Sequence, residues 1–357
     1  MGQHRAAGMP MMVLFSALLV LAAYLTWQQH EKAAGSTRVA LPNLTADSGH
    51  FTYSRLAGPG RTVVRDGNGA VVARFTDGAR TVVLKGPMRT FRETGKLKGK
   101  PTAWTVQHAD WVRFAPKPWK AGAERSAWFR KWFPKLLTDR SPDMFAIAMQ
   151  YVSGTPVVRK NGLKIAGDAG FGPPSPHKKP GDADYIDENS DFYDYLGIRY
   201  RFKDGVTEHP SPRHYRFMDC TGFLRTVLGY RMGFPMASER NERHRTGLLP
   251  RRAWMMDEFG PGVVIVPHHR LEVATEIGAL QPGDMLFFDI DARPADGWHV
   301  DHSGIYLGLD TKGHPRFISS REDANGPTFS DIGGSARLDI KGPHVLYATH
   351  WRSAKRL

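Results

Sequence analysis

The stretch FMDCTGFLRTVLG, residues 217–229, decides the fold of this chain, because it places the only cysteine at the start of a helix. Apolar side chains recur at helical spacing after Cys220, and Gly229 or Gly233 can end the helix. We therefore expect a helix beginning at residue 219 with Cys220 in its first turn. Free backbone N–H groups there favour the thiolate, which lowers the pKa of a cysteine from about 8.5 and activates it as a nucleophile.

Strand-like runs follow this helix, at residues 262–266, 285–288, 304–307, 316–319 and 345–348. A helix followed by antiparallel strands is the order of an α+β domain. His302 stands just before the run at 304–307, where a sheet can hold its imidazole over the helix start. A cysteine on a helix and a histidine on a sheet, distant in sequence, form the arrangement of papain-like hydrolases.

Three motifs in this half of the chain resemble those of the NlpC family of cell-wall cysteine peptidases. FMDCTGFL (217–224) resembles the family's Asp-Cys-Ser-Gly-Phe signature, LQPGDMLFF (280–288) its Gln-Pro-Gly-Asp strand, and DHSGIYLG (301–308) its His-Val-Gly-Ile-Tyr segment. The motifs follow the family's order within roughly residues 190–355. The resemblance implies a papain-like α+β fold, in which the helix that carries the cysteine packs on an antiparallel sheet.

The resemblance also implies roles for residues of the site. Cys220 would be the nucleophile and His302 the general base, while the family's third polar residue, commonly histidine, falls on Ser319. Asp301, Ser320, Arg321 and Asp323 are the substitutes for that third role.

Three further residues are assigned to substrate binding, namely Tyr200, Asp219 and Arg251. Tyr200 would line the pocket and Asp219 would cap the helix, while Arg251 is a candidate to meet an acidic peptide stem. The alternatives are core packing for Tyr200 and a solvated surface position for Arg251. Histidines at 268, 269, 299 and 302 lack further ligands at a suitable spacing, so we expect neither a metal nor another cofactor.

The expected activity is that of an exported cysteine peptidase acting on the peptide stem of bacterial peptidoglycan. Thiolate attack on an amide carbonyl would form an acyl-enzyme, which water then hydrolyses. The resemblance implies a bond that involves D-glutamate and a diamino acid. Two alternatives stay open: an amidase or acyltransferase of the same fold acting on another acyl donor, and a non-catalytic cell-wall-binding protein.

The N-terminus indicates the compartment. An apolar run from Met9 to Trp27 follows Arg5 and predicts that residues 1–35 are a secretory signal peptide or a membrane anchor. We expect the rest of the chain to be extracellular or associated with the cell wall, with 9–27 as the segment that would anchor it in the cytoplasmic membrane.

A single cysteine in 357 residues excludes an intrachain disulfide framework.

Residues 40–135 are predicted to be a basic, β-rich accessory region. Strand-like runs at 62–64, 71–73 and 81–84 are separated by turn residues, and 85–135 carries thirteen Lys or Arg, three acids and five tryptophans. With a formal net charge of +14, this composition favours anionic wall polymers or a membrane surface as partners. Nucleic acid is not an expected partner of an exported protein. The alternative is a solvated basic face with tryptophans in the core.

A helix and a linker are predicted at 136–182, before an NlpC-like domain at 183–357. Ser141 and Pro142 are a typical N-cap and first helical residue, and the apolar run after them continues as a helix. The stretch GFGPPSPHKKPG (170–181) contains too many prolines and glycines for a regular element, so it predicts a loop at a domain boundary.

Overall fold

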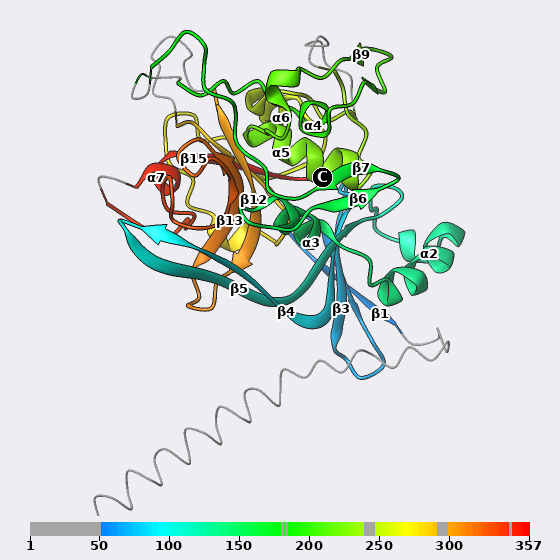
Figure 1. The fold of residues 1–357 in the computed structure, drawn as a ribbon. Coiled ribbons are helices and arrows are strands. Elements are labelled where there is room, and N and C mark those ends of the chain that lie inside the picture. The colour runs from blue at the N-terminus through cyan, green and yellow to red at the C-terminus, as the bar shows by residue number, and fades with distance from the viewer. Residues whose placement is uncertain (1–50, 180–181, 183–184, 239–246, 291–298, 343–344) are drawn as a thin grey trace, which may run out of the picture. The chain divides into compact units, whose positions relative to one another are not determined.

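Two antiparallel sheets and several short helices build the protein in a computed structural model, which describes residues 51–357 except 180–181, 183–184, 239–246, 291–298 and 343–344 (Figure 1). The mixed α+β class expected from the sequence is confirmed. The described residues belong to one compact unit. The predicted signal peptide or anchor at 1–35 lies outside the described residues. Within the described part, no helix is long and apolar enough to cross a bilayer.

The N-terminal sheet has the order β1-β2-β3-β4-β5, and each strand is antiparallel to its neighbour. The predicted runs at 62–64, 71–73 and 81–84 are confirmed as strands. The sequence did not reveal β1, β5 or the full length of β4, because β1 is exposed throughout and buried positions are sparse in β5 and in the second half of β4. The strands are β1 (Thr52–Leu56), β2 (Arg61–Arg65), β3 (Val71–Thr76), β4 (Thr81–Leu97) and β5 (Lys100–Phe114).

The C-terminal sheet has the order β10-β15-β11-β12-β13-β14 and is also antiparallel throughout. Four of the five predicted runs are confirmed as strands. The fifth prediction is wrong, because 345–348 begins the helix α7 (Leu346–His350), and the strand follows it. The strands are β10 (Val263–Val266), β11 (Met285–Phe288), β12 (His302–Leu309), β13 (Pro315–Arg321), β14 (Gly326–Thr328) and β15 (Trp351–Arg356).

Strand β15 is not predicted from the sequence, because its residues, WRSAKR, are mostly polar. All six residues are nevertheless buried between β10 and β11. The Lys355 ammonium donates to the carbonyls of Met256 and Gly260, and Arg356 pairs with Asp284. Polar side chains can occupy a central strand when each finds a partner in the fold, and a single sequence does not show such partners.

Short helices and two small hairpins connect the sheets. The predicted helix after Ser141 begins later than expected, at Met144, and its cap is Asp143, whose carboxylate accepts from the Ala146 amide at 3.1 Å. Asp143 also pairs with Arg89, which fixes the helix start against β4. The remaining elements are η1 (Ala123–Arg125), α2 (Ala127–Thr138), α3 (Met144–Ala148), η2 (Met149–Tyr151), β6 (Val158–Lys160), β7 (Leu163–Ala166), α4 (Phe192–Leu196), β8 (Tyr200–Arg201), β9 (Thr207–Glu208), η3 (Pro212–His214), α5 (Cys220–Leu224), η4 (Arg225–Arg231), α6 (Ala253–Glu258) and η5 (Ile277–Ala279).

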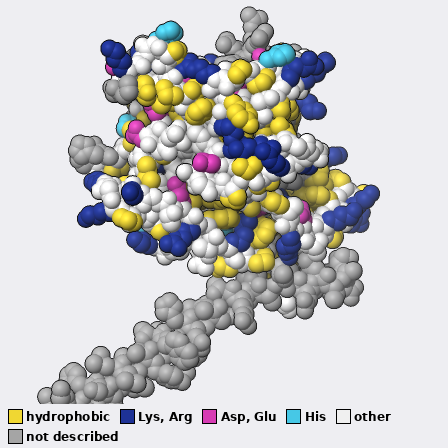
Figure 2. All heavy atoms as spheres, viewed as in Figure 1, with side chains coloured by type: hydrophobic (Ala, Val, Ile, Leu, Met, Phe, Trp, Pro, Cys, Tyr) yellow, Lys and Arg dark blue, Asp and Glu magenta, His cyan; other side chains and the backbone are white. Residues whose placement is uncertain are grey.

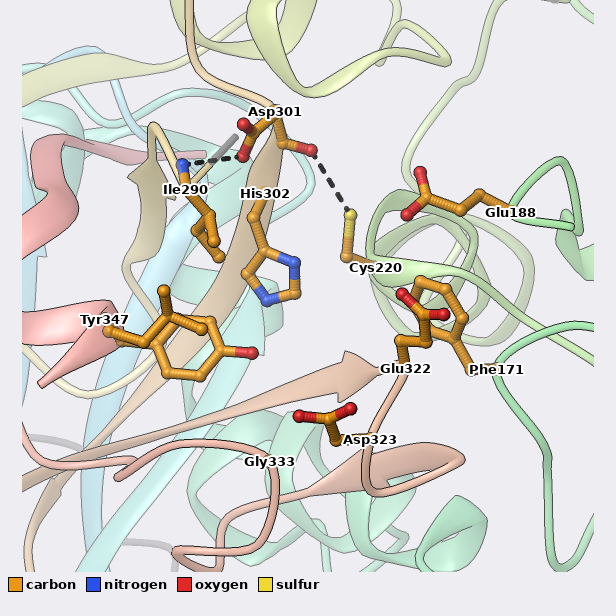
Figure 3. Close-up of a pocket in the computed structure, with 11 residues that line it drawn as sticks. Phe171, Glu188, Cys220, Ile290, Asp301, His302, Glu322, Asp323, Gly333 and Tyr347 are labelled. Atoms are coloured by element: carbon orange, nitrogen blue, oxygen red, sulfur yellow. Dashed lines mark hydrogen bonds between the residues drawn. The ribbon is translucent and has the colours of Figure 1, made fainter. Parts of the chain in front are cut away.

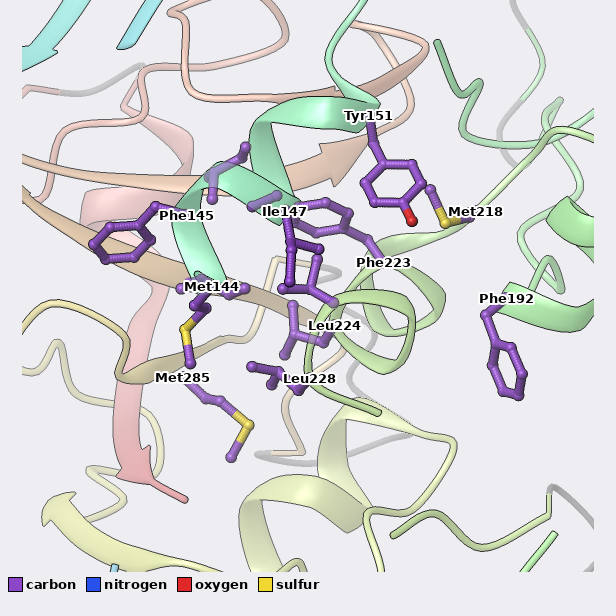
Figure 4. Close-up of a cluster of buried hydrophobic side chains, with 14 of the residues drawn as sticks. Met144, Phe145, Ile147, Tyr151, Phe192, Met218, Phe223, Leu224, Leu228 and Met285 are labelled. Atoms are coloured by element: carbon purple, nitrogen blue, oxygen red, sulfur yellow. The ribbon is translucent and has the colours of Figure 1, made fainter. Parts of the chain in front are cut away.

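The C-terminal sheet separates two clusters of buried apolar side chains. Alternation along its strands sends Met285 and Phe287 into the larger cluster, and Leu286 and Phe288 into the smaller one. The larger cluster also contains side chains of α5, of α3 and of the β4–β5 hairpin, as Figure 4 shows for α3 and α5. The predicted accessory region and the cysteine helix therefore share one core.

A buried ion pair joins the predicted Gln-Pro-Gly-Asp motif to both sheets. The Arg356 guanidinium donates to both carboxylate oxygens of Asp284, at 2.7 Å each, and its third nitrogen donates to the Thr76 hydroxyl of β3. Both charged side chains are almost completely buried. Removing one partner would leave a buried charge without compensation, which is costly.

We expect Asp284→Asn to lower the free energy of unfolding by about 3–5 kcal/mol. The half-exposed pair of Asp339 and Arg337 is the control, and Asp339→Asn should cost less than about 1 kcal/mol. Urea denaturation of both variants measures the difference. Equal losses would show that Asp284 does not hold the two sheets together.

Candidate active site

Cys220 is the first residue of α5, and Asp219 caps this helix. The Asp219 carboxylate accepts from the Gly222 amide at 2.7 Å, as the sequence predicts for a first-turn cysteine. The helix continues from Leu224 into the π-helical segment η4, so Cys220 begins a continuous helical stretch up to Arg231.

A close backbone contact fixes this helix start. A Cβ atom on Gly222 would lie 2.2 Å from the Ser190 carbonyl oxygen, so only glycine permits the approach. The Asp219 amide donates to the same carbonyl at 3.0 Å. The loop before α4 thereby sets the position of the helix start.

Arg251 lies behind the cysteine helix and is 3 % exposed. Its guanidinium pairs with the Asp219 carboxylate and donates to the Thr221 hydroxyl. Asp191 lies 3.8 Å from Arg251 and also binds Arg225 at 3.0 Å. Arg251 is not among the described residues that line the cavity, so the structure places it as a support of the helix start.

His302 begins β12, opposite Phe288 of β11. Alternation along β12 places its side chain on the same face as Tyr306 of the smaller apolar cluster. The imidazole packs on the Tyr347 ring at 5.1 Å between centroids and on Phe288 at 6.0 Å. Cys220 lies beside the same strand start, because its thiol meets the carbonyl of Asp301, the residue before His302.

Cys220 and His302 line one cavity of about 310 Å³ (Figure 3). Figure 3 shows the imidazole between Cys220 and Tyr347, and Asp323 on the opposite wall. Both Cys220 and His302 are only 8 % exposed. The other described lining residues are Phe171, Glu188, Ile290, Asp301, Glu322, Asp323, Gly333, Leu346 and Tyr347.

The thiol of Cys220 is neutral in this arrangement. It donates to the Asp301 carbonyl at an Sγ–O distance of 3.7 Å. Burial raises its pKa, and the negative charges of Asp219 and Glu188 act in the same direction. The expected lowering by the helix start does not prevail, because desolvation penalises a thiolate more than the N–H groups of a short helix stabilise it.

His302 is neutral as well. Burial, together with the positive charge of Arg321, lowers the pKa of His302 to about 3. Its buried Nε2 atom has no hydrogen-bond partner among the described residues. The cavity therefore holds a neutral thiol and a neutral imidazole, so a nucleophilic attack by this thiol would have to be accompanied by proton transfer.

Ser319 lies on β13, on the same face as His302, but its hydroxyl accepts from Arg321 Nε at 2.9 Å. The Arg321 guanidinium lies 4.3 Å from the Tyr347 ring, which in turn packs on His302. Ser319 is therefore connected to the imidazole through two intermediate side chains. Its predicted catalytic role stays a prediction.

The other candidates for the third role differ in position. The Ser320 hydroxyl donates to the Met218 carbonyl, and one Asp301 oxygen accepts from the Ile290 amide. Asp323 lines the cavity opposite His302. Tyr200 lies on β8, where its ring packs against Phe192 at 4.8 Å, and it is not among the described cavity residues.

Sequence reasoning missed the acidic character of the cavity and the tyrosine beside the histidine. Four of the described lining residues are carboxylic acids, and none is Lys or Arg. Glu322 and Asp323 directly follow β13, and Glu188 precedes α4, so no common motif contains them. Tyr347 lies in the run taken for a strand. Only the fold brings these segments together.

Three of the four histidines considered for zinc, at positions 268, 269 and 299, lie against acidic partners. His269 is 2.8 Å from Glu276, and His299 is 2.6 Å from Glu258. Throughout the described residues, no group of three or more His, Cys, Asp or Glu is arranged to hold a metal ion.

Comparison with known proteins gives no match. No family model matches this chain, and neither a curated protein nor a solved structure resembles it significantly.

The low pKa of His302 predicts acid sensitivity. The unfolded state takes up a proton below the ordinary histidine pKa of about 6.5, whereas the folded state does so only near pH 3, so stability falls as the pH decreases between these values. Between pH 6 and pH 4 we expect the titration of His302 alone to lower the free energy of unfolding by about 2–3 kcal/mol.

Urea denaturation at both pH values tests this expectation. The variant His302→Phe preserves aromatic packing and cannot titrate. Its free energy of unfolding should therefore decrease less between pH 6 and pH 4 than that of the wild type, by about 2–3 kcal/mol. The exposed His177→Ala is the control and should retain the loss of the wild type. An unchanged pH dependence in His302→Phe would contradict the assignment.

Proposed function

We propose that this protein is an exported cysteine peptidase that hydrolyses an amide bond in the peptide stem of bacterial peptidoglycan. The observation that carries the proposal is the meeting of Cys220 and His302 at one cavity, from a helix start and a strand start 82 residues apart. A nucleophile and a base delivered by separate elements are what acyl transfer through a thiol requires. The papain-like, NlpC-type fold is part of the same proposal and rests on the three motifs.

The proposed reaction begins with the neutral pair. As the sulfur attacks the amide carbonyl carbon, the thiol proton passes to the imidazole of His302. The amine leaves with that proton, and an acyl-enzyme remains on Cys220. Water then attacks the thioester with His302 as base, which regenerates the thiol. The backbone amide of Ser303 favours a charged sulfur and so supports the first step.

The charge of the cavity bears on the substrate. Its described lining holds Glu188, Asp301, Glu322 and Asp323, and Arg251 is buried elsewhere. An acidic stem carboxylate would be repelled there, whereas a neutral amide or the free amine of a diamino acid would be accepted. We propose that the amine-bearing side of the stem enters this cavity.

A non-catalytic cell-wall-binding protein is the second candidate. It is favoured by the raised pKa of the Cys220 thiol, by its hydrogen bond to the Asp301 carbonyl and by the lowered pKa of His302. An amidase or acyltransferase of the same fold would use the same pair, and only its products would distinguish it.

Cys220→Ala should lower the release of soluble fragments from purified cell walls at least about a hundredfold, because the nucleophile is removed. Chromatography and mass spectrometry of the digests identify the bond that is cut. Circular dichroism and wall co-sedimentation should match the wild type, since the substitution removes one sulfur from the cavity wall. Comparable fragment release by both proteins would exclude the cysteine mechanism.

A neutral thiol reagent separates the two candidates, because Cys220 is the only cysteine. A catalytic thiol is blocked together with the activity. If the unlabelled protein hydrolyses neither wall nor peptide, although the reagent labels Cys220 completely, the result would favour the binding protein.

Ser319→Ala tests the third catalytic role. The serine holds Arg321, which packs on Tyr347 beside the imidazole. We expect turnover to fall about 10- to 100-fold, or about 1.4–2.8 kcal/mol, while the thiol still reacts with the neutral reagent. Asp323→Asn is the matched variant in the cavity. Wild-type kinetics in Ser319→Ala, with a collapse in Asp323→Asn, would transfer the role to the carboxylate.

A further inference from the structure

Helix α2 presents an outer face of alternating tryptophan and lysine, formed by Trp128, Lys131, Trp132 and Lys135, which we call the α2 face. These positions follow the i, i+3, i+4, i+7 spacing of one helix side. Both lysines are exposed and both tryptophans are half-buried, with their ring centroids 5.7 Å apart. The opposite side of α2 is buried and consists of Phe129, Phe133, Leu136 and Leu137.

The surroundings of the α2 face are strongly basic. Residues 115–140 contain seven Lys or Arg and two acids. All seven bases are exposed, whereas Asp139 pairs with Arg113. Figure 2 shows Lys and Arg side chains beside hydrophobic ones where Figure 1 places α2. The exposed bases are Lys117, Lys120, Arg125, Arg130, Lys131, Lys135 and Arg140.

The chain reaches this surface from the apolar N-terminal run. Phe51, the first described residue, packs on Phe133 of α2 at 5.4 Å between ring centroids, and Tyr53 packs on Phe129 at 6.2 Å. Twenty-three residues, 28–50, separate Trp27 from Phe51. This length of chain spans at most about 80 Å. If residues 9–27 lie in a membrane, α2 is held within that distance of the lipid headgroups.

We propose that the α2 face docks on anionic phospholipid headgroups. Tryptophan rings prefer the interface between headgroups and acyl chains, and lysines beside them attract anionic lipids. Because the membrane segment would tether α2, docking becomes intramolecular, and even a weak affinity of the α2 face for lipid is then sufficient. Wall polymer shares the negative charge but offers no apolar layer for Trp128 and Trp132, so the tryptophans favour lipid. The proposal is independent of catalysis by Cys220.

Lysine footprinting on the full chain tests the proposal. The protein is reconstituted with vesicles of phosphatidylcholine alone, or with added phosphatidylglycerol, and acetylated with a reagent that does not cross membranes. Acetylation of Lys131 and Lys135 should slow about fivefold or more with phosphatidylglycerol, and high salt should reverse this. Exposed Lys160 and Lys312 are internal controls and should keep their rates.

Tryptophan quenching by brominated phosphatidylglycerol supplies a second measurement. We expect quenching to fall by a similar amount in Trp128→Phe/Trp132→Phe and in Lys131→Glu/Lys135→Glu. The control Lys160→Glu/Lys312→Glu carries the same charge change elsewhere and should behave as the wild type. Equal acetylation of all four lysines, protection that is as strong on phosphatidylcholine alone, or protection by isolated wall polymer but not by lipid would each overturn the proposal.

Discussion

The position of the candidate nucleophile depends on the buried contact between Asp219 and Arg251. One carboxylate caps the helix through the Gly222 amide and at the same time neutralises a guanidinium that is almost completely buried. The same carboxylate therefore serves the helix start and the arginine behind it, which would be costly to bury without a partner. Cys220 is therefore held by groups that do not themselves face the cavity.

Burial of the site determines its chemistry as much as its residue types do. A cysteine at a helix start and a nearby histidine suggest an ion pair of thiolate and imidazolium. Instead, desolvation raises the pKa of Cys220 and lowers that of His302 to about 3, and Arg321 adds to the effect on the histidine. In the proposed reaction, a substrate that brings a polar carbonyl into the cavity would change this balance, so the reactive state would be reached with the substrate rather than before it.

The basic residues of the chain lie in two different environments. Arg225, Arg321 and Arg356 are among the largest fully buried side chains, and their guanidinium groups bind carbonyls, hydroxyls and carboxylates inside the fold. These bases are structural and cannot meet a polyanion. The bases around α2, in contrast, are exposed and stand beside two half-buried tryptophans. The net charge of +14 therefore overstates the positive charge on the surface. The positions of the exposed bases are a better indication of where a polyanion can bind.

The sequence by itself determined the α+β class, the helix start at Asp219 and Cys220, and four strands of the C-terminal sheet, because these depend on local capping and on apolar alternation. Only the tertiary structure decided that WRSAKR is a central strand, that 346–350 is a helix, and that Arg251 lies behind the cysteine helix rather than in the cavity. It also decided that Tyr347, Glu188 and Asp323 share a cavity with Cys220 and His302. The reason is physical: a polar residue becomes buried or exposed according to the partners that distant segments bring to it, and those partners leave no pattern in the neighbouring sequence.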